Sequence, residues 1–321
     1  MSICYKIKEA FKLLKKGQLF KFITTRSKIK RLLNKSKNGK ISDEEYLVAV
    51  GKIYLGYTMD LKNPKTFNEK INWYKLHYYN PLMVKCVDKI EVGNYVESKG
   101  LKDILVPKLK VWDSVDDINI DELPEKFVIK TNADSGGVII VTDKSKFDYK
   151  QLDKIKYYLS KDFSNGGKEW PYGEVKKQIF AEAYLDDNEH KVPYDYKFFC
   201  FNGRVEYLMV CSERDIALKQ DLFDREFNWL NILCKSYPNN VAHRPTKPLL
   251  FDKMIEYAEI LSKDFPQVRV DFYQINGKIY FGELTFYTDA GFGKFGSYNE
   301  DLQLGTPFNI NSIKKSEFYK E

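Results

Sequence analysis

Two acidic residues in the C-terminal third of the chain are spaced so that they could share a metal ion. Two strand-like runs, 269–273 and 279–285, flank an Asn-Gly turn, and such a turn between β-branched and aromatic residues predicts an antiparallel hairpin. Pairing then brings Asp271 and Glu283 onto neighbouring strands, with Thr285 two residues further on. Hard oxygen ligands without a nearby His or Cys favour Mg2+. The alternative is an ordinary hairpin with solvated carboxylates.

Strict two-residue alternation assigns the side chains of this hairpin to its two faces. It places Arg269 and Asp271 together on one face of the first strand. On the second strand it places Glu283 on the same face as Phe281 and Thr285. Two carboxylates flanked by apolar residues repel each other unless a cation lies between them. We therefore expect a cation at this hairpin.

A lysine and a glycine-containing loop earlier in the chain have the arrangement of a phosphate site. Lys130 ends the apolar strand 127–130, and the loop 132–137, with Gly136 and Gly137, follows it closely. From this position the ammonium can reach a phosphate while backbone N–H groups of the loop close over the other oxygens. The alternative is a lysine whose head group extends into solvent.

The composition describes a soluble globular protein of two or more lobes, because 321 residues with 43% apolar and 30% charged residues can bury a large core. Five cysteines without a C-x-x-C pair and three separated histidines predict reduced thiols and no zinc site. No segment reaches the roughly 18 apolar residues of a membrane span, and no signal-peptide pattern occurs. We expect a cytoplasmic protein.

The positive charge is concentrated in residues 1–40, which hold thirteen Lys or Arg and one acidic residue. Basic and apolar residues interleave there at near-helical spacing, interrupted by Gly17. Such a segment can lie on an anionic membrane surface, or it can pack on the protein with a solvated lysine face. The rest of the chain is acidic and has no recognition motif, so we expect no nucleic-acid partner.

Local signals predict the remaining elements. Capping residues predict helices beginning near Ser42 and Thr66, and an amphipathic helix over 88–99 follows a strand or loop. Further helices are expected over 147–162 and 250–264, and strands over 104–106, 127–130, 138–141, 178–185, 194–201 and 205–210. Hairpins in place of βαβ crossovers indicate an α+β chain of mainly antiparallel sheets.

The order of these motifs resembles the ATP-grasp superfamily and, within it, the TupA-like family, which is associated with cell-surface polysaccharide biosynthesis and named for teichuronopeptide assembly. The resemblance covers roughly residues 45–307, and its motifs are 63–70, 87–89, 127–132, 195–203 and 269–286. It implies an ATP-grasp fold that holds a nucleotide between two antiparallel-sheet lobes. The expected regions are a basic arm (1–40), a helical or α/β region (41–125), a small lobe with the phosphate loop (126–190) and a large lobe with the metal site (191–321).

The resemblance also implies roles for nucleotide-binding residues. Lys89 and Lys130 would contact the ATP phosphates. Glu182 and the backbone of Ala183 and Tyr184 would read adenine. The mobile loop covering the phosphates would consist of Asp134, Ser135, Gly136 and Gly137, and the ribose contact would come from Asp186, Asp187 or Glu189.

The same resemblance implies Mg2+ ligands and catalytic groups. Asp271 and Glu283 match the metal ligands, whereas Thr285, expected as third ligand, departs from the usual Asn at that position. Arg269 matches the arginine facing the transferring phosphate or the later oxyanion. Asp195 and Lys197 belong to the family motif and are assigned to the site without a specific role.

The implied reaction is an ATP- and Mg2+-dependent ligation in capsular or wall polysaccharide biosynthesis. A carboxylate, from a uronic acid or an amino acid, would be activated as an acyl phosphate and joined to an amine. Loop 134–137 would exclude water from this reactive species. The partners would be a polysaccharide or lipid-linked glycan acceptor and a small amine or amino acid, with the basic arm at the inner face of the membrane.

Other functions fit the sequence less well. The run 291–296 matches G-x-G-x-x-G but does not open a βαβ unit, and we interpret it as a flexible loop near the acceptor. Ser135, Ser212 and the cysteines lack a neighbouring His motif, which argues against a hydrolase. A glycosyltransferase would be expected to carry Asp-x-Asp after an apolar strand, and the sequence has no convincing copy of this motif. A kinase using the same nucleotide site and a non-catalytic nucleotide-binding module remain open.

Overall fold

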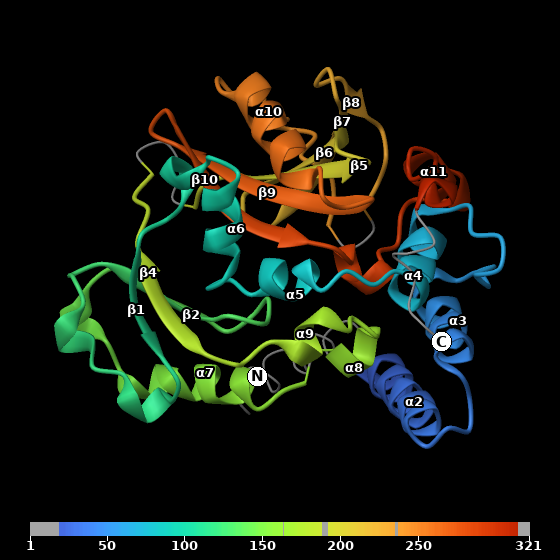
Figure 1. Ribbon diagram of the computed structural model, residues 1–321, viewed down its shortest axis with the longest axis horizontal. Coiled ribbons are helices and arrows are strands. Elements are labelled where there is room, and N and C mark those ends of the chain that lie inside the picture. The colour runs from blue at the N-terminus through green and yellow to red at the C-terminus, as the bar shows by residue number, and fades with distance from the viewer. Residues whose placement is uncertain (1–18, 163, 188–191, 235–236, 314–321) are drawn as a thin grey trace. The chain divides into compact units, whose positions relative to one another are not determined.

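The computed structural model describes residues 19–162, 164–187, 192–234 and 237–313. The chain divides into two compact units, each built from two separate chain segments (Figure 1). The first unit comprises the residues up to Thr58 together with Pro107–Tyr184, and the second comprises Met59–Val106 and the residues from Leu185 onward. The four continuous regions expected from the sequence stay predictions.

A four-stranded antiparallel sheet forms the centre of the first unit. Its strand order is β1-β4-β2-β3, with β1 at Lys108–Trp112, β2 at Phe127–Thr131, β3 at Val138–Val141 and β4 at Ile179–Ala183. Helix α7 (Leu152–Leu159) packs against β2 and β3. Phe127, Ile129 and Ile155 are fully buried in the core that this helix forms with the sheet.

Helices complete the first unit. They are α2 (Leu19–Lys37), α3 (Asp43–Leu55), α8 (Ser164–Gly167) and α9 (Pro171–Glu174). The predicted start of α3 is confirmed, because Ser42 and Glu45 form a reciprocal capping box. The hydroxyl of Tyr46 donates to the Gly166 carbonyl (2.9 Å), and the ammonium of Lys168 pairs with Asp43 (2.6 Å). These contacts anchor the α8 region on α3.

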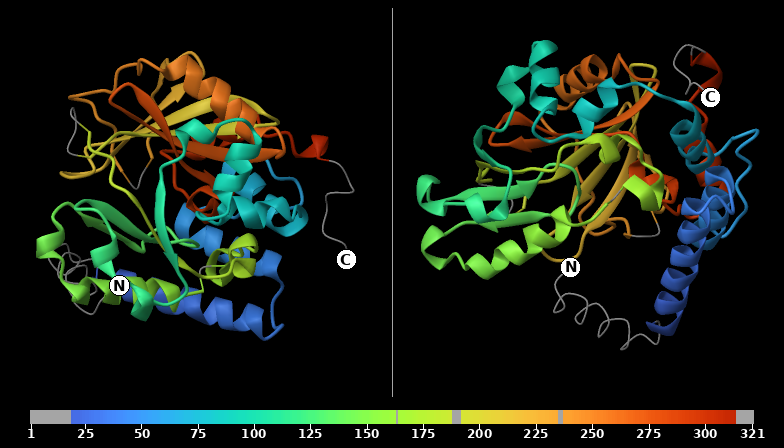
Figure 2. Two further views of the ribbon diagram at one scale, coloured as in Figure 1. Left: turned by 60° about the vertical axis from the view of Figure 1, so that its left-hand side comes forward. Right: turned by 60° about the horizontal axis from the view of Figure 1, so that its bottom comes forward.

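The basic arm is helical where the structure describes it. Helix α2 is the long blue helix in Figure 2. It has no acidic residue in its first turn and two lysines in its last. None of its described side chains is buried, and Phe20 is 79% exposed. Residues 1–18, including Gly17, lie outside the described residues.

A six-stranded antiparallel sheet forms the centre of the second unit. Its order is β10-β9-β5-β6-β7-β8, with β5 at Asp195–Phe201, β6 at Arg204–Ser212, β7 at Lys219–Asp224, β8 at Trp229–Leu230, β9 at Gln267–Ile275 and β10 at Lys278–Thr285. Helix α10 (Phe251–Ser262) lies across β9, β5 and β6 on one face (Figure 1). Met254, Ala258 and Leu261 of α10 are fully buried, as the predicted stripe required.

Four more helices belong to the second unit. They are α4 (Phe67–His77), α5 (Leu82–Val87), α6 (Val92–Ser98) and α11 (Tyr298–Gly305). Thr66 and Glu69 cap α4 reciprocally, which confirms the predicted start. Side chains of α4 bind the C-terminal segment: Asn68 donates to the Asp301 carboxylate (2.7 Å), and Lys70 donates to the carbonyls of Gly305 (2.8 Å) and Phe308 (2.7 Å).

Several predicted elements were wrong or misplaced. Residues 82–87 form helix α5, not a strand or loop, and β1 begins after Pro107 where a strand over 104–106 was expected. Helix α7 is shorter than 147–162. Short 3-10 helices fill the intervening segments at Lys102–Ile104, Val115–Asp117, Ile120–Glu122, Lys144–Lys146, Tyr149–Gln151, Thr288–Gly291 and Ile310–Ser312. These segments carry turn-forming residues but bury too few side chains for a longer helix.

Both Asn-Gly hairpins are confirmed. Asn202 and Gly203 connect β5 to β6, and Asn276 and Gly277 connect β9 to β10; all four have positive φ values between 50° and 78°, as a type I′ turn requires.

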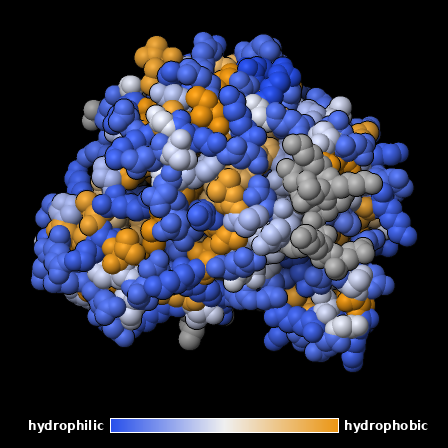
Figure 3. All heavy atoms as spheres, viewed as in Figure 1, coloured by the Kyte–Doolittle hydropathy of each residue, from blue (hydrophilic) through white to orange (hydrophobic). Residues whose placement is uncertain are grey.

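The described cysteines, Cys86, Cys200, Cys211 and Cys234, are buried free thiols, as expected. Among the described residues no helix is long and apolar enough to cross a membrane. Apolar side chains on the face shown in Figure 3 occur in patches separated by hydrophilic ones.

Candidate functional site

Three charged side chains stand in a row across the second unit's sheet. Lys197 on β5 pairs with Asp271 on β9, and Asp271 pairs with Glu283 on β10. Side chains directly opposite each other on adjacent antiparallel strands lie about 5 Å apart. The two carboxylates lie on neighbouring strands, as predicted, and the structure sets them directly opposite each other, with the lysine as a third member.

A β-bulge at Gly282 corrects the faces expected from strict alternation. Phe281 pairs with Phe272, yet Glu283 pairs with the very next residue, Asp271, so Gly282 is the extra residue. Phe281 therefore lies on the apolar face, where its ring contacts Phe272, and only Glu283 and Thr285 share the charged face. Without the bulge, Glu283 would follow Phe281 into the core.

The Arg269 guanidinium joins the two carboxylates. Its Nε and Nη2 donate to the two oxygens of Asp271, each at 2.7 Å. Nη2 also lies 3.0 Å from Glu283 Oε1 and 3.0 Å from Thr285 Oγ1. The Thr285 hydroxyl donates to Glu283 Oε1 at 2.8 Å. Four of the predicted residues thus form one connected network.

Lys197 extends this network along β5. Its ammonium bonds to Asp271 and lies 2.7 Å from Asp195. Arg214, which follows β6, contacts the same Asp195 oxygen, Oδ2, at 2.6 Å. The Asp195 side chain is only 3% exposed, and its Oδ1 has no hydrogen-bond partner in the part of the chain that the structure describes. We call Asp195, Lys197, Arg269, Asp271 and Glu283, with Thr285 and Arg214, the charged cluster.

Burial and neighbouring charges shift the pKa values of Glu283, Lys197 and Asp271 in this cluster. Desolvation opposes the charge on Glu283, but Lys89, Arg269 and Lys197 outweigh it and lower the Glu283 pKa to about 2. Desolvation likewise opposes the charge on Lys197, and the carboxylates of Asp195 and Asp271 raise its pKa instead. Burial raises the pKa of Asp271, and Arg269 and Lys197 oppose that rise. Removing one of these cations therefore leaves a buried carboxylate poorly compensated.

The first unit holds the predicted phosphate lysine. Lys130 on β2 forms an ion pair with Glu182 on β4. Register places both on the sheet face opposite the core, together with Val128 and Phe180. Ile140, which pairs with Val128 on this face, is 59% exposed. Phe180 and Val128 are buried, so Ile140 is the exposed apolar side chain among those named on this face.

The predicted phosphate loop is closed on itself. The N–H groups of Gly136 and Gly137 donate to Asp134 Oδ1 at 2.8 and 2.6 Å, and the Thr131 hydroxyl donates to the same carboxylate. Ser135 at the tip is exposed. The Asp134 carboxylate occupies donors expected to face a phosphate, so binding through them requires the loop to rearrange.

The residues predicted to bind adenine and ribose have different contacts and exposure in the structure. The Ala183 N–H donates to the Pro107 carbonyl at 3.0 Å, so that group is used within the first unit. The Tyr184 ring lies beside the Lys126 ammonium. Asp187 is half-buried, whereas Asp186 is exposed and its carbonyl accepts from Asn276 at 2.9 Å. Glu189 lies outside the described residues.

Comparison with known proteins decides the family. The chain matches the family described as TupA-like ATPgrasp over residues 69–309, three quarters of its length. The chain belongs to this family. It therefore has the ATP-grasp fold, α+β with two antiparallel sheets.

Solved structures are similar to this ATP-grasp chain at low identity. D-alanine–D-alanine ligase from Bacillus anthracis is 18% identical with a TM-score of 0.40, over 70% of this chain and 68% of the ligase. N5-carboxyaminoimidazole synthetase from Staphylococcus aureus, complexed with ADP, is 14% identical with a TM-score of 0.38, over 76% of this chain and 56% of the synthetase. No curated protein matches the chain.

The donor atoms of this ATP-grasp chain fit Mg2+ by their chemistry. No group of three or more His, Cys, Asp or Glu side chains suited to a metal occurs in the described part. The candidate ligands are the two carboxylates predicted from the sequence, Asp271 and Glu283, together with the Thr285 hydroxyl, and all three offer hard oxygens. Glu283 is 33% exposed, and its Oε1 accepts from Arg269 and Thr285. Both Asp271 oxygens already accept from Arg269 or Lys197, so a metal ion would compete with these cations there.

Sequence reasoning missed Arg214. Nothing in the run Ser212-Glu213-Arg214 distinguishes this arginine from a solvated residue after a strand. Only the antiparallel pairing of β5 and β6, which sets Cys211 opposite Asp195, brings Arg214 to that carboxylate. Lys89, which was predicted, faces Glu283 electrostatically from the segment after α5.

Proposed function

We propose that this chain is an ATP- and Mg2+-dependent ligase of capsular or wall polysaccharide biosynthesis. It activates a carboxylate as an acyl phosphate and joins it to an amine. The observation that carries the proposal is the buried Arg269 guanidinium, which contacts Asp271 and Glu283 beside Lys197. A cation cluster built around two carboxylates suits a reaction in which negative charge develops on transferring phosphate.

In this proposal the first unit binds the nucleotide. The nucleotide would lie on the sheet face that carries Lys130 and the exposed Ile140 side chain. The Lys130 ammonium would exchange Glu182 for a phosphate. Opening of the Asp134 contacts would free the N–H groups of Gly136 and Gly137 for the other phosphate oxygens. The rearranged loop, bound over the phosphates, would then exclude water.

The charged cluster would carry the chemistry. Asp271, Glu283 and Thr285 would hold Mg2+, which supplies positive charge to the phosphates when bound. An oxygen of the substrate carboxylate attacks the γ-phosphorus, the bond to the β-γ bridging oxygen breaks, and ADP leaves. Arg269 and Lys197 offset the negative charge on the transferring group.

The second step is attack of an amine on the acyl carbon. A tetrahedral oxyanion forms, the carbon–oxygen bond to phosphate breaks, and an amide and inorganic phosphate result. The Arg269 guanidinium, released from one carboxylate, can stabilise that oxyanion. The amine must lose a proton in this step, and the Asp195 carboxylate, whose Oδ1 is unpartnered among the described residues, is the candidate acceptor.

A hydroxylamine trap tests this function. Incubation with Mg-ATP, hydroxylamine and a panel of carboxylates should give a hydroxamate together with ADP, because hydroxylamine attacks an acyl phosphate. A kinase would release ADP without hydroxamate, and a glycosyltransferase would require a nucleotide sugar. Either of these outcomes would reject the ligase.

Replacing Glu283 by Gln checks the metal assignment. We expect ADP release to fall at least about 100-fold, since even outer-shell changes cost 10- to 100-fold in metal sites. The matched control is Glu256→Gln, because Glu256 is 54% exposed on α10 and pairs only with Lys253. Equal activity of a folded Glu283→Gln variant would contradict the assignment.

We also propose that α2 contacts an anionic membrane, where a lipid-linked glycan acceptor would be held. Phe20 and Ile23 are 79% and 53% exposed on a helix rich in Lys and Arg, a composition suited to a headgroup surface. The variant Lys28→Gln/Lys30→Gln/Arg31→Gln should lose salt-sensitive binding to phosphatidylserine vesicles. Binding that survives these substitutions, or is absent in the parent protein, would count against the contact.

A further inference from the structure

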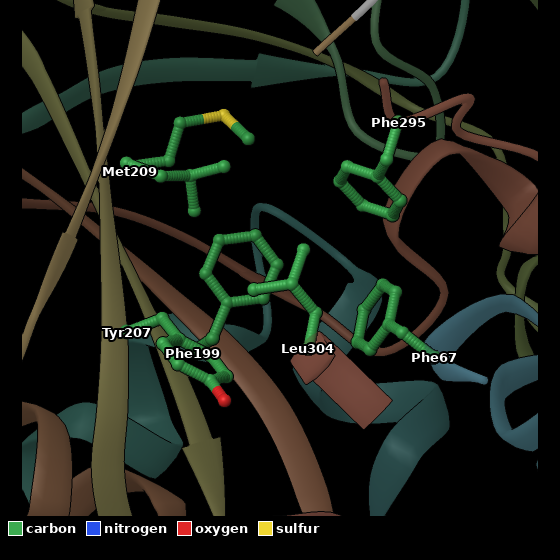
Figure 4. A pocket seen from close by; sticks show the side chains of 7 residues that line it. Phe67, Phe199, Tyr207, Met209, Phe295 and Leu304 are labelled. Carbon is green, nitrogen blue, oxygen red and sulfur yellow. The ribbon is translucent and has the colours of Figure 1, made fainter. Parts of the chain in front are cut away.

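The pocket drawn in Figure 4 belongs to the core of the second unit. The side chains of Phe67, Phe199, Met209 and Leu304 converge there, and none of these four residues is more than 7% exposed. Side chains buried this deeply line a packing gap, not a surface that a substrate could reach. The loop after β2 in the first unit is a different case, because its hydrogen-bond donors are held by a carboxylate of its own.

Two neighbouring residues of β2 point to opposite faces of the first unit's sheet. Lys130 pairs with Glu182 on the face opposite the core. Thr131 follows Ile129 by two residues, so its side chain lies on the core face, where Thr131 is 2% exposed. The Thr131 hydroxyl donates to the Asp134 carboxylate. This carboxylate is therefore held on the core side of the sheet, away from Lys130.

The Asp134 carboxylate also takes the N–H groups of the loop. The N–H groups of Gly136 and Gly137 donate to its Oδ1 at 2.8 and 2.6 Å, while Oδ2 accepts from Thr131. Two backbone N–H groups and a hydroxyl around one anion are donors that a phosphate would use. An anion of the chain itself occupies them, and Asp134 is only 9% exposed. We call Thr131, Asp134, Gly136 and Gly137 the latch.

Helix α7 supports the latched loop. Gly136 lies so close to the Tyr158 ring that a Cβ at this position would collide with it. Lys154, one turn earlier on α7, donates to the Val138 carbonyl at 2.7 Å. Burial lowers the Lys154 pKa, and the Asp134 carboxylate opposes this effect, so the ammonium faces the latch electrostatically. The latched loop is therefore packed and its negative charge is partly compensated.

We propose that Asp134 is a built-in competitor of ATP for the N–H groups of Gly136 and Gly137. A phosphate cannot join the carboxylate there, because both N–H groups are already used and two anions in a buried site repel each other. ATP then engages the loop only in molecules whose latch has opened. Its apparent dissociation constant is the intrinsic constant divided by the open fraction. The inference rests on the proposed function and adds how the nucleotide affinity of that site is set.

Calorimetric titration with Mg-ATP tests the competition. Asp134→Ala removes the three latch contacts, so ATP should bind about tenfold more tightly, since one hydrogen bond to a charged group changes an equilibrium constant by roughly tenfold or more. Thr131→Val weakens the latch without altering a charge and should shift the dissociation constant in the same direction. The matched control is Asp143→Ala, because Asp143 accepts from the Ser145 N–H at 3.1 Å in the turn after β3; this variant should bind ATP like the parent.

Two fragments of ATP distinguish competition from a general loosening of the unit. Mg-tripolyphosphate carries the phosphates alone, and Asp134→Ala should tighten its binding by the same factor as that of ATP. Adenosine lacks phosphates and should bind the parent and the variant equally. Gly137→Ala does not suit this test, because its Cβ would collide with Thr131 in the latched loop and would also stand beside an N–H group that a phosphate needs.

The outcomes separate this inference from the proposed function. Weaker or unchanged Mg-ATP binding by Asp134→Ala or Thr131→Val would overturn the inference while leaving the nucleotide site in place. Equal tightening with adenosine would also overturn it, because the competition would not be for phosphate. If Asp134→Ala does not fold, Asp134→Asn, which keeps the side chain's shape and loses its charge, meets the same expectation. A folded parent protein that does not bind Mg-ATP would overturn the proposed function and this inference with it.

Discussion

Removing the Lys197 ammonium should lower the free energy of unfolding of the second unit. Its side chain is 11% exposed and bonds to two carboxylates that are 3% and 2% exposed. Lys197→Met retains most of the side chain's length and removes the charge. In this variant the buried carboxylates of Asp195 and Asp271 each lose one compensating positive charge.

The size of the loss in unfolding free energy depends on the hydrogen bonds and ion pairs that each carboxylate retains. Removing one partner of a buried ion pair costs about 3–5 kcal/mol. Asp271 retains two hydrogen bonds from Arg269, and Asp195 retains Arg214. We therefore expect the lower end, about 3 kcal/mol of unfolding free energy near neutral pH.

The loss of unfolding free energy in Lys197→Met should be smaller at low pH than at neutral pH. Burial already raises the Asp271 pKa, and without the Lys197 ammonium it rises further. A group with a raised folded-state pKa stabilises the fold at low pH, and this stability is lost as pH rises through that pKa. The parent and Lys197→Met should therefore differ less in free energy of unfolding as pH falls toward the ordinary carboxyl pKa of about 4.

Urea unfolding monitored by far-UV circular dichroism at pH 5 and pH 8 measures the loss of unfolding free energy and its change with pH. The control is Lys253→Met, because Lys253 is 47% exposed and pairs with an exposed glutamate; such pairs contribute about 1 kcal/mol or less. A loss for Lys197→Met no larger than the control's, or a loss that grows as pH falls, would refute the electrostatic reasoning.

Three further substitutions test separate contacts. Gly137→Ala places a Cβ against the Thr131 hydroxyl, so ATP affinity by calorimetry should fall by tenfold or more, and unchanged affinity would remove the loop from the nucleotide site. Ser42→Ala breaks the capping box with Glu45 and should lower unfolding free energy by about 1 kcal/mol; Ser42→Asp, which can still cap, should not. Thr285→Val removes a hydroxyl bonded to Glu283 and should raise the Mg2+ concentration needed for half-maximal ADP release, whereas an unchanged requirement would exclude Thr285 as a ligand.

Local chemistry made part of this structure predictable. Asn202-Gly203 and Asn276-Gly277 adopt the backbone that their side chains favour, and the capping pairs at Ser42 and Thr66 form within three residues. Such interactions close over short loops, so their entropy cost is small and the neighbouring residues suffice to specify them.

The faces of the site could not be predicted in the same way. Glycine at 282 permits a bulge, but whether an extra residue is inserted depends on pairing with β9. Strict alternation therefore put Phe281 beside Glu283, and the structure separates them. The closed state of the loop, in which Asp134 accepts from two glycine N–H groups, was likewise not evident from its composition.

The sequence by itself determined the two hairpins, the capped helices, the order of the family motifs and the placement of Asp271 and Glu283 on neighbouring strands. Only the tertiary structure decided which cations compensate those carboxylates and how Arg214 reaches Asp195. The physical reason is distance along the chain. Turns and caps are made by adjacent residues, whereas the compensation of a buried charge depends on side chains that meet only after strands from separate segments have paired.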